Sequence, residues 1–583
     1  MTLQRYLALL GPCEDAPERM RRIGDRLVHE GYSVHIHHEE DFALLVLGDP
    51  PMAIDAGLIV GPLFDRRHPG PIETLAPEDQ AKIRASQGRH LTEIFWGGYV
   101  AFVRTDEGID LLRAPLGELA CLFVHQAPRT WVASDIALLK RTGMAPFATD
   151  WSMIAQHLAW PYLRGSWTCL EKVMALPSGH KLQSSGARIR MAPLWSPWAF
   201  ADQPQCLTRD EHVEQIARAV TNSVATLAAH WGRPVLLLSG GLDSSIIAAT
   251  LARHDADLLT LYTRDPIGDE RAYAAQVAKH IGKPLIEARR EVSEVHPLRS
   301  AAGGLPWPAR RLFEQETMRH VDLASAAHGA AALMTGGGGD NVFCALQSAA
   351  PVADRLLVEG PGPGMLGTAR EISALASAPM PTVLRSAIAK AMPWARKSIA
   401  RPDHAYLSED AKVRAGACPP AHPWLTPPAR PLPGLAGHIR LLALAQSFSE
   451  GRDPAATIPT ILPLLAQPVV EACLAVPSWL WFEKGRNRAL ARRAFAPHLP
   501  RAIVERRSKG TPDSFQGEIF EHHHATLRDM LLGGALADQG LIDLSRLTRV
   551  FSGPVPMAPP DVGSLLRLVD VEAWLRSAPG RHE

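Results

Sequence analysis

The hydrophobic pattern of the first third of the chain predicts short strands. Brief apolar runs recur there, and glycine and proline separate them. This spacing is typical of stacked antiparallel sheets. We therefore predict a β-rich layered domain for residues 1–205. The runs are residues 42–47, 56–60, 98–103, 109–113 and 119–124.

The pattern changes at about residue 206, where helical periodicity begins to alternate with strand-like runs. This alternation predicts an α/β domain with a parallel sheet over residues 206–583. Two of the strand-like runs end in glycine-rich turns, so both turns are expected at the same edge of the sheet. The predicted helices are 211–230, 244–253 and 270–281, and the predicted strands are 235–238, 258–263 and 331–335.

Residues 351–433 form a stretch rich in proline, alanine and glycine without strong periodicity. We predict a helical insert there, made of irregular helices and loops. Prolines also interrupt the longest apolar segment, residues 461–482, so we predict that no segment spans a membrane.

Bulk properties narrow the class of protein. A chain of 583 residues is too long for one core and indicates two domains. The net charge of +1 gives no global field that would attract nucleic acid, so we expect no nucleic-acid partner. The seven cysteines are scattered, and no secretion signal is apparent, which favours the cytoplasm.

A glycine turn between a buried strand and a helix carries the candidate chemistry. Residues 239–245 read SGGLDSS after an apolar run. Backbone N–H groups at such a helix start bind phosphate, and the serines add hydroxyl donors. Asp243 is an unusual neighbour for phosphates unless a divalent cation lies between them, which points to Mg²⁺. A bare SGG would indicate only a generic glycine turn.

The same string resembles the pyrophosphate loop of ATP pyrophosphatases, which split ATP between its α- and β-phosphates. It lacks the GxxxxGK[ST] pattern of γ-phosphate transfer. Over nearly its whole length the chain resembles the asparagine synthetase family. The resemblance implies an N-terminal nucleophile (Ntn) hydrolase-like α+β layered-sheet domain. An α/β parallel-sheet synthetase domain of the ATP-pyrophosphatase type (adenine nucleotide alpha hydrolase-like) would follow it.

By this resemblance, ATP and Mg²⁺ are the cofactors, and three further motifs contribute to their site. Residues 261–270 resemble the strand that touches the adenine, residues 335–343 the acidic glycine loop, and residues 506–510 the lysine motif. Asp340 would share Mg²⁺ with Asp243, and Lys509 would stabilise the pyrophosphate and the transition state. Read alone, the glycines fit a flexible turn and Lys509 fits a surface residue. The implied ATP and pyrophosphate contacts are Leu238, Ser239, Gly240, Gly241, Asp243, Ser244, Ser245, Thr263, Thr335 and Gly336.

The N-terminal half departs from glutamine-dependent family members. Thr2 stands where they carry a nucleophilic cysteine, and residues 60–64 read VGPLF in place of the oxyanion-stabilising segment. The landmarks at residues 97–102, 114–117 and 133–135 nevertheless resemble those of the family's amidotransferase domain. We predict a degenerate domain without glutaminase activity, so that the substrate supplies its own amine.

The segments WGGYVAF and TGGGGDNVFCALQSAAPVADRL, the second at residues 335–356, resemble the lasso-peptide cyclases. The implied reaction adenylates an Asp or Glu side chain of a ribosomal precursor peptide, and the peptide's N-terminal amine then closes a macrolactam. A leader peptidase is the implied partner. Two alternatives are an ammonia-dependent asparagine synthetase or other small-molecule amide or β-lactam synthetase, and an inactive nucleotide-binding scaffold. The intact Asp243, Asp340 and Lys509 argue against the last.

Overall fold

The computed structural model describes most of the chain. The described residues are 3–12, 15–144, 146–185, 188–200, 207–309, 311–392, 402–451, 456, 458–507, 513–553 and 559–577.

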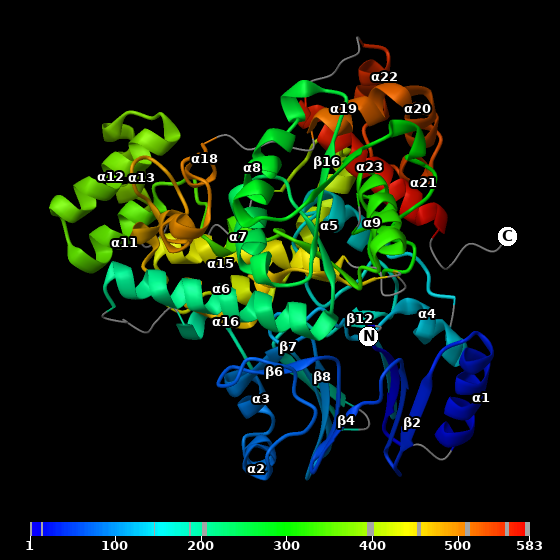
Figure 1. Ribbon diagram of the computed structural model, residues 1–583. Coiled ribbons are helices and arrows are strands. Elements are labelled where there is room, and N and C mark those ends of the chain that lie inside the picture. Colours follow the sequence, from blue (N-terminus) through cyan, green and yellow to red (C-terminus); the bar gives the residue numbers. More distant parts are fainter. Residues whose placement is uncertain are drawn as a thin grey trace.

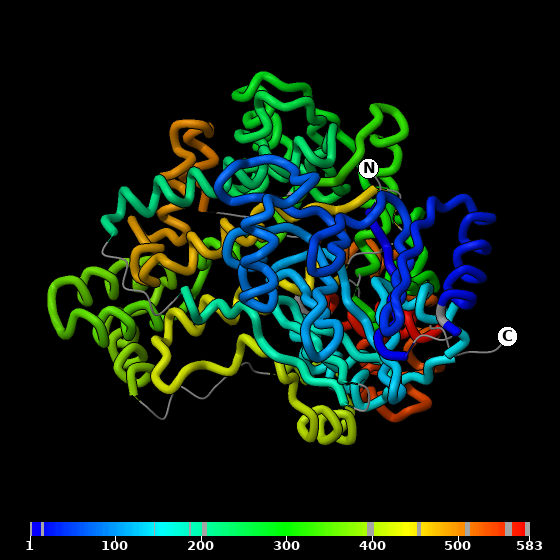
Figure 2. Tube along the Cα trace, turned by 90° about the horizontal axis from the view of Figure 1, so that it is seen from below, coloured from blue at the N-terminus to red at the C-terminus, as the bar shows by residue number. Residues whose placement is uncertain are grey.

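Two six-stranded antiparallel sheets form the centre of the N-terminal part (Figure 1, blue and cyan; Figure 2, from below). The first sheet has the order β12-β10-β11-β1-β3-β2, with β1 Arg5–Leu10, β2 Val34–His38, β3 Phe42–Leu47, β10 Leu122–Gln126, β11 Arg129–Ala133 and β12 Met174–Ala175. The second has the order β14-β13-β9-β8-β5-β4, with β4 Met52–Ile54, β5 Gly57–Val60, β8 Val100–Thr105, β9 Gly108–Arg113, β13 His180–Ser185 and β14 Arg188–Pro193.

Alternate residues of these strands belong to different cores, because successive side chains of a strand point to opposite faces. Leu44 and Val46 share one buried cluster with Val100 and Phe102, so the two sheets pack face to face. On the outer faces, Leu45 packs with helix α1 (Ala16–His29), and Ala101 packs with α2 (Pro77–Ala85) and α3 (Arg89–Ile94). The result is an α/β/β/α sandwich, which confirms the predicted Ntn-hydrolase-like layering.

A five-stranded parallel sheet forms the centre of the C-terminal part, in the order β17-β16-β15-β18-β19. Helices cover both faces. Leu236 lies in one core with α6, α7 and α8, whereas its neighbour Val235 lies in another with α9. The predicted α/β parallel-sheet fold is therefore confirmed. The elements are β15 Pro234–Leu237, β16 Asp257–Tyr262, β17 Leu285–Arg289, β18 Ala332–Thr335, β19 Thr460–Ile461, α6 Arg209–Trp231, α7 Leu242–Thr250, α8 Arg271–Ile281 and α9 Glu314–His328.

The strand order places a topological switch point at β15. The chain runs outward from β15 to β16 and β17 on one side, while β18 pairs with β15 on the other. Ligands of open α/β sheets bind at the carboxyl ends of strands beside such a switch. The turns after β15 and β18 are the two glycine loops of the sequence, so the sheet brings them together.

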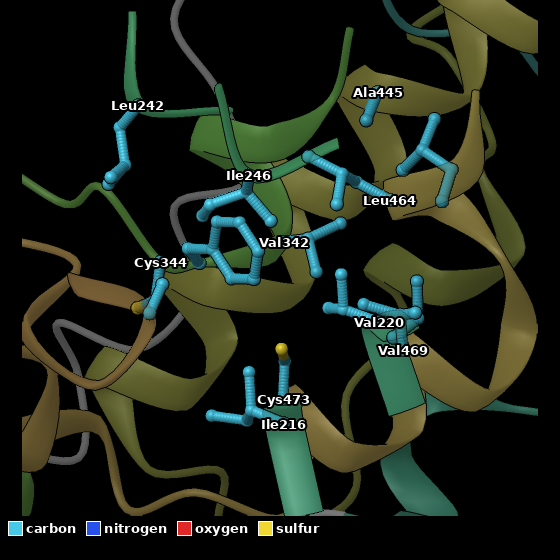
Figure 3. Packing of buried hydrophobic residues seen from close by; sticks show 14 of the residues in the cluster. Ile216, Val220, Leu242, Ile246, Val342, Cys344, Ala445, Leu464, Val469 and Cys473 are labelled. Carbon is cyan, nitrogen blue, oxygen red and sulfur yellow. The ribbon is translucent and has the colours of Figure 1, made fainter. Parts of the chain in front are cut away.

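Behind the first loop lies a tightly packed apolar core (Figure 3). Ile216 and Val220 of α6 lie beside Cys473 and Val469 of α16 (Gln467–Leu474), and Ile246 of α7 lies beside Val342. All of these side chains are fully buried. Close packing of this kind gives the start of α7 a rigid base.

Residues 350–391 fold into three regular helices where irregular helices and loops were predicted. These are α11 Ala350–Glu359, α12 Pro363–Ala376 and α13 Met380–Ala391. Each has proline at its first or second position, where the missing N–H has no helical partner in any case. The prolines therefore start these helices and do not interrupt them.

The C-terminal helices pack against a helix from the N-terminal part of the chain. Phe515 of α19 (Asp513–His522) and Trp574 of α23 (Pro559–Ser577) share one buried cluster with Ile154 of α5 (Trp151–Ala159). None of the helices in the described ranges combines the length and the apolar character that a bilayer-spanning segment needs.

Candidate active site

The turn after β15 has the geometry that its glycines predict. Gly240 has a φ of 68°, and a Cβ there would lie 2.5 Å from Cβ of Tyr273. Only glycine fits this position without a shift. Ser239 and Ser244 join the two sides of the turn, with 3.2 Å between their hydroxyl oxygens, and Ser245 donates to the carbonyl of Gly241 at 2.7 Å. The turn thus presents the start of α7 in a fixed shape.

The turn after β18 packs directly onto the first one. A Cβ on Gly336 would lie 2.7 Å from the backbone nitrogen of Ser244, and a Cβ on Gly339 would lie 2.5 Å from Cγ of Asp243. These glycines allow a close approach between two backbones, which a merely flexible turn does not require. Asp340 follows in α10 (Gly339–Val342), directly after Gly339.

One arginine joins the two aspartates. Nη1 of Arg488 lies 3.0 Å from Oδ1 of Asp243 and 2.6 Å from Oδ1 of Asp340. The side chains of Arg488 and Asp243 are about 90% buried, whereas 39% of the Asp340 side chain is exposed. Arg488 has a φ of 57°, a left-handed conformation that costs a non-glycine residue ~1 kcal/mol. The two carboxylates therefore lie close enough together to share one cation, which here is the guanidinium of Arg488.

This donor set fits Mg²⁺. Magnesium in nucleotide sites takes one or two carboxylates and completes its octahedron with phosphate and water oxygens. Within the described part of the chain, no group of three or more His, Cys, Asp or Glu residues could hold a metal ion alone. A site made by Asp243 and Asp340 therefore depends on a phosphate ligand.

A second arginine braces the first loop from outside. Arg506 donates from Nη1 to the carbonyl oxygen of Gly240 at 3.0 Å, pairs with Glu270 at 2.5 Å and stacks 3.8 Å from the ring centroid of Tyr273. Arg492 in turn donates to the carbonyl of Arg506 at 3.1 Å. Burial lowers the pKa of Arg492 to about 10. Sequence reasoning gave no role to any of these arginines, and the position of Arg506 in the lysine motif was the only available indication.

The other residues predicted to contact the nucleotide either lie along the same edge of the sheet or are not among the residues that the structure describes. Leu238 is buried and donates its N–H to the carbonyl of Leu259, and Thr263 follows the end of β16. The Thr263 hydroxyl lies 3.4 Å from that of Ser514. Thr335 ends β18, and its hydroxyl accepts from the N–H of Gly337 at 3.1 Å. Lys509 and Thr2 lie outside the described residues.

A cavity of about 410 Å³ opens onto both loops. Its lining includes Ser239, Asp243 and Gly336. The other walls come from α5, from residues 308–309 and 311–318, from the end of α15 (Pro433–Glu450) and from α23. Aromatic and aliphatic side chains form much of these walls, namely Leu158, Tyr162, Phe313, Met318, Leu407, Phe448, Leu462 and Leu568. Such a volume suits a ligand of drug-like size.

These features belong to a known class of enzyme. A family profile described as asparagine synthase matches residues 215–423 and 451–576, which is more than half of the chain. The chain therefore belongs to the asparagine synthase family and is a ligase that forms carbon–nitrogen bonds. The family forms amide bonds at the expense of ATP, and the predicted family membership is confirmed. No curated protein matches the sequence.

Two solved structures show a distant likeness. One, the allosteric regulatory enzyme of purine biosynthesis, is 8% identical over 50% of this chain and 82% of its own, with a TM-score of 0.22. The other is glutamine phosphoribosylpyrophosphate amidotransferase from B. subtilis in complex with ADP and GMP. It is 10% identical over 44% of this chain and 65% of its own, with a TM-score of 0.21. Both are too distant to indicate an activity for this chain.

Proposed function

We propose that this protein closes a macrolactam in a lasso-peptide precursor. A side-chain carboxylate of the peptide attacks the α-phosphorus of ATP, which gives an acyl adenylate and releases pyrophosphate. The peptide's N-terminal amine then attacks the acyl carbon, loses a proton and expels AMP. The product is the peptide less one water.

The two glycine loops are the proposed nucleotide site. The N–H groups at the start of α7 face the pyrophosphate, with Ser239 and Ser244 as additional donors. The predicted contact from Ser245 is wrong for its hydroxyl, which is fully buried and donates to the carbonyl of Gly241. Asp243 and Asp340 would hold Mg²⁺, which would offset the charge that builds up on the leaving pyrophosphate. Lys509 adds a positive charge for the transition state. The contact between the two loops supports this assignment, because it puts both carboxylates beside the phosphate-binding turn.

The observation that carries the substrate proposal is the cavity beside these loops. It has room for several side chains, and its walls are mainly apolar, whereas free aspartate is small and doubly charged. A peptide segment matches this size and polarity better. Holding the activated carboxylate near the amine is the main catalytic task, because effective concentration supplies much of the rate enhancement.

The loss of glutaminase activity is proposed from residues 61–64 as well as from Thr2. The N–H of Gly61 donates to the side chain of Gln4 at 2.6 Å and is therefore engaged. Phe64 is fully buried, 4.7 Å from Trp96 and 5.2 Å from His230 between ring centroids. This segment serves the packing of the two halves of the chain, so the substrate must bring its own amine.

Several accompanying assignments are part of the same proposal. The chain divides into an amidotransferase-like domain, 1–205, and a synthetase domain, 206–583, with the insert near 351–433. The protein acts in the cytoplasm on a peptide whose leader has been removed by a cognate peptidase. The rival reaction, amide synthesis on a small molecule such as aspartate with free ammonia, uses the same loops and differs only in what fills the cavity.

The test is incubation of the protein with ATP, Mg²⁺ and a leader-free lasso precursor peptide. The expected products are AMP, pyrophosphate and a peptide lighter by one water. An N-acetylated peptide should still release pyrophosphate but should form no ring. ADP as the stoichiometric product would refute the adenylation step. AMP formed with aspartate and ammonia, but not with the peptide, would favour the rival.

A further inference from the structure

When the residues that form ion pairs are left out, the lining of the cavity carries more positive than negative charge. Four arginines and four acids line it. Asp243 pairs with Arg488, and Asp403 pairs with Arg567. Burial raises the pKa of Asp570 to about 8, so this carboxyl is mostly protonated at neutral pH. The remaining charged groups are Glu314 and the guanidinium groups of Arg164, Arg290 and Arg311.

Arg311 lines this cavity, and its guanidinium lies near two aromatic rings, those of Tyr162 and Phe313. Its Cζ lies 5.1 Å from the ring centroid of Tyr162 and 5.7 Å from that of Phe313. Stacking of this kind holds a cation without using its N–H donors. Among the described residues this guanidinium makes no hydrogen bond or close ion pair, and it interacts electrostatically with the carboxyl group of Asp570. The paired N–H groups of a guanidinium match the two oxygens of a carboxylate.

Arg164 adds a second cation to the same lining. Its Cζ lies 4.9 Å from the ring centroid of Trp307, and its Nε and Nη1 atoms are buried without a partner among the described residues. Burial lowers the pKa of this arginine to about 10. The attraction of Glu450 offsets only part of the cost of burying this cation, so a further anion nearby would stabilise it.

We infer that the cavity binds a substrate carboxylate other than the one that is activated, carried on an apolar residue, with Arg311 as the residue that receives it. The apolar walls contact the side chain of that residue, and the charge of Arg164 strengthens the field at the carboxylate. In the proposed reaction this group is a carboxylate that the peptide retains. The inference rests on the proposed function only in that it takes the cavity as the substrate site.

The experiment compares two probes that differ only in their C-terminal group, N-acetyl-phenylalanine with a carboxylate and N-acetyl-phenylalaninamide with a carboxamide. Each is titrated onto the full-length protein by ligand-observed NMR. The acid should bind about tenfold more tightly than the amide, because a charge-assisted bidentate bond is lost in the amide. Equal affinities for the two probes would overturn the inference, and this comparison needs no variant.

Variants then assign the effect to Arg311. Arg311→Gln should abolish the preference for the acid, and Arg311→Lys should retain part of it. The matched control is Arg289→Gln, because Arg289 pairs with Glu291 and does not line the cavity. An unchanged preference in Arg311→Gln, or a loss of ATP affinity with the preference intact, would show that Arg311 does not receive the carboxylate. Pyrophosphate release is measured separately, so either result leaves the proposed function standing.

Discussion

Arg506 fixes the direction of one peptide unit in the first glycine loop, because it donates to the carbonyl oxygen of Gly240 at 3.0 Å. The C=O and the following N–H of a trans peptide point in opposite directions. Holding the Gly240 carbonyl outward therefore turns the N–H of Gly241 into the loop, where it meets the hydroxyl of Ser239 at 3.3 Å. This is the orientation that binding of a phosphate through backbone N–H groups requires.

Arg506→Gln should weaken the binding of ATP and pyrophosphate by about tenfold, with little effect on AMP. The reason is that the loop loses its brace where the β- and γ-phosphates are expected. Calorimetric titration of the three ligands checks this. The neighbouring Arg507 is exposed, so Arg507→Gln is the control. Equal losses for AMP and ATP would instead indicate a general effect on folding.

Removal of either aspartate should stop carboxylate activation. Asp243→Asn and Asp340→Asn each delete a charge from the proposed metal site, and pyrophosphate exchange should fall by about 10²-fold or more. The control is Asp257→Asn, which alters a buried carboxylate at the amino end of β16, where it pairs with Arg233 at 2.9 Å. Exchange at near-normal rates in both site variants would remove the metal assignment.

Arg488→Gln should make the stability of the protein depend more strongly on Mg²⁺. Asp243 and Asp340 both contact Arg488, so they lie close together and repel each other when that charge is removed. Added Mg²⁺ should then raise the melting temperature of the variant more than that of the wild type. Arg493→Gln is the control, because Arg493 lies in α17 (Ala489–Phe495), the helix that follows Arg488, and pairs with Glu483. An identical response to Mg²⁺ in variant and wild type would contradict the prediction.

Much of the fold could be predicted because its strands are short apolar runs separated by turn residues. The run 42–47 is buried on both faces, so it shows no alternation, yet its flanking residues still mark a strand. The order of the strands was not predictable, since it depends on pairings between distant segments. The prolines near residues 351, 363 and 381 were misinterpreted because their effect depends on their position in a helix.

The candidate site was predictable only where chemistry is concentrated in a short motif. Asp243 and Asp340 each follow a glycine turn at the end of a strand, so topology alone brings them together. Arg488 lies 245 residues beyond Asp243 in the sequence. It belongs to none of the motifs that predicted the site, so the sequence did not indicate its role. The cavity is assembled from both halves of the chain, and no local pattern indicates which arginines will lack a partner within it.

Asp570 should make the protein less stable as the pH rises from about 4 to about 8. An aspartate in the unfolded chain has a pKa near 3.9, whereas burial raises the pKa of Asp570 to about 8 in the folded protein. Between these values the folded state holds a proton that the unfolded state has released. The stabilisation from this group is therefore complete below about pH 4 and is lost as the pH rises through about 8.

Asp570→Asn cannot ionise but can still accept the hydrogen bond from the N–H of Leu312, which lies 2.8 Å from Oδ1. The variant should therefore gain stability relative to the wild type from pH 5 to pH 8, and the difference should level off above pH 9. Urea unfolding at a series of pH values measures this difference.

Asp543→Asn is the control, because hydrogen bonds from the backbone of α22 (Leu544–Phe551) lower the pKa of Asp543. The stability of that control should differ from that of the wild type by a constant amount above pH 5. The reason is that the Asp543 carboxyl is then ionised in both the folded and the unfolded wild-type protein. A constant difference for Asp570→Asn as well would show that its carboxyl is already charged in the folded protein.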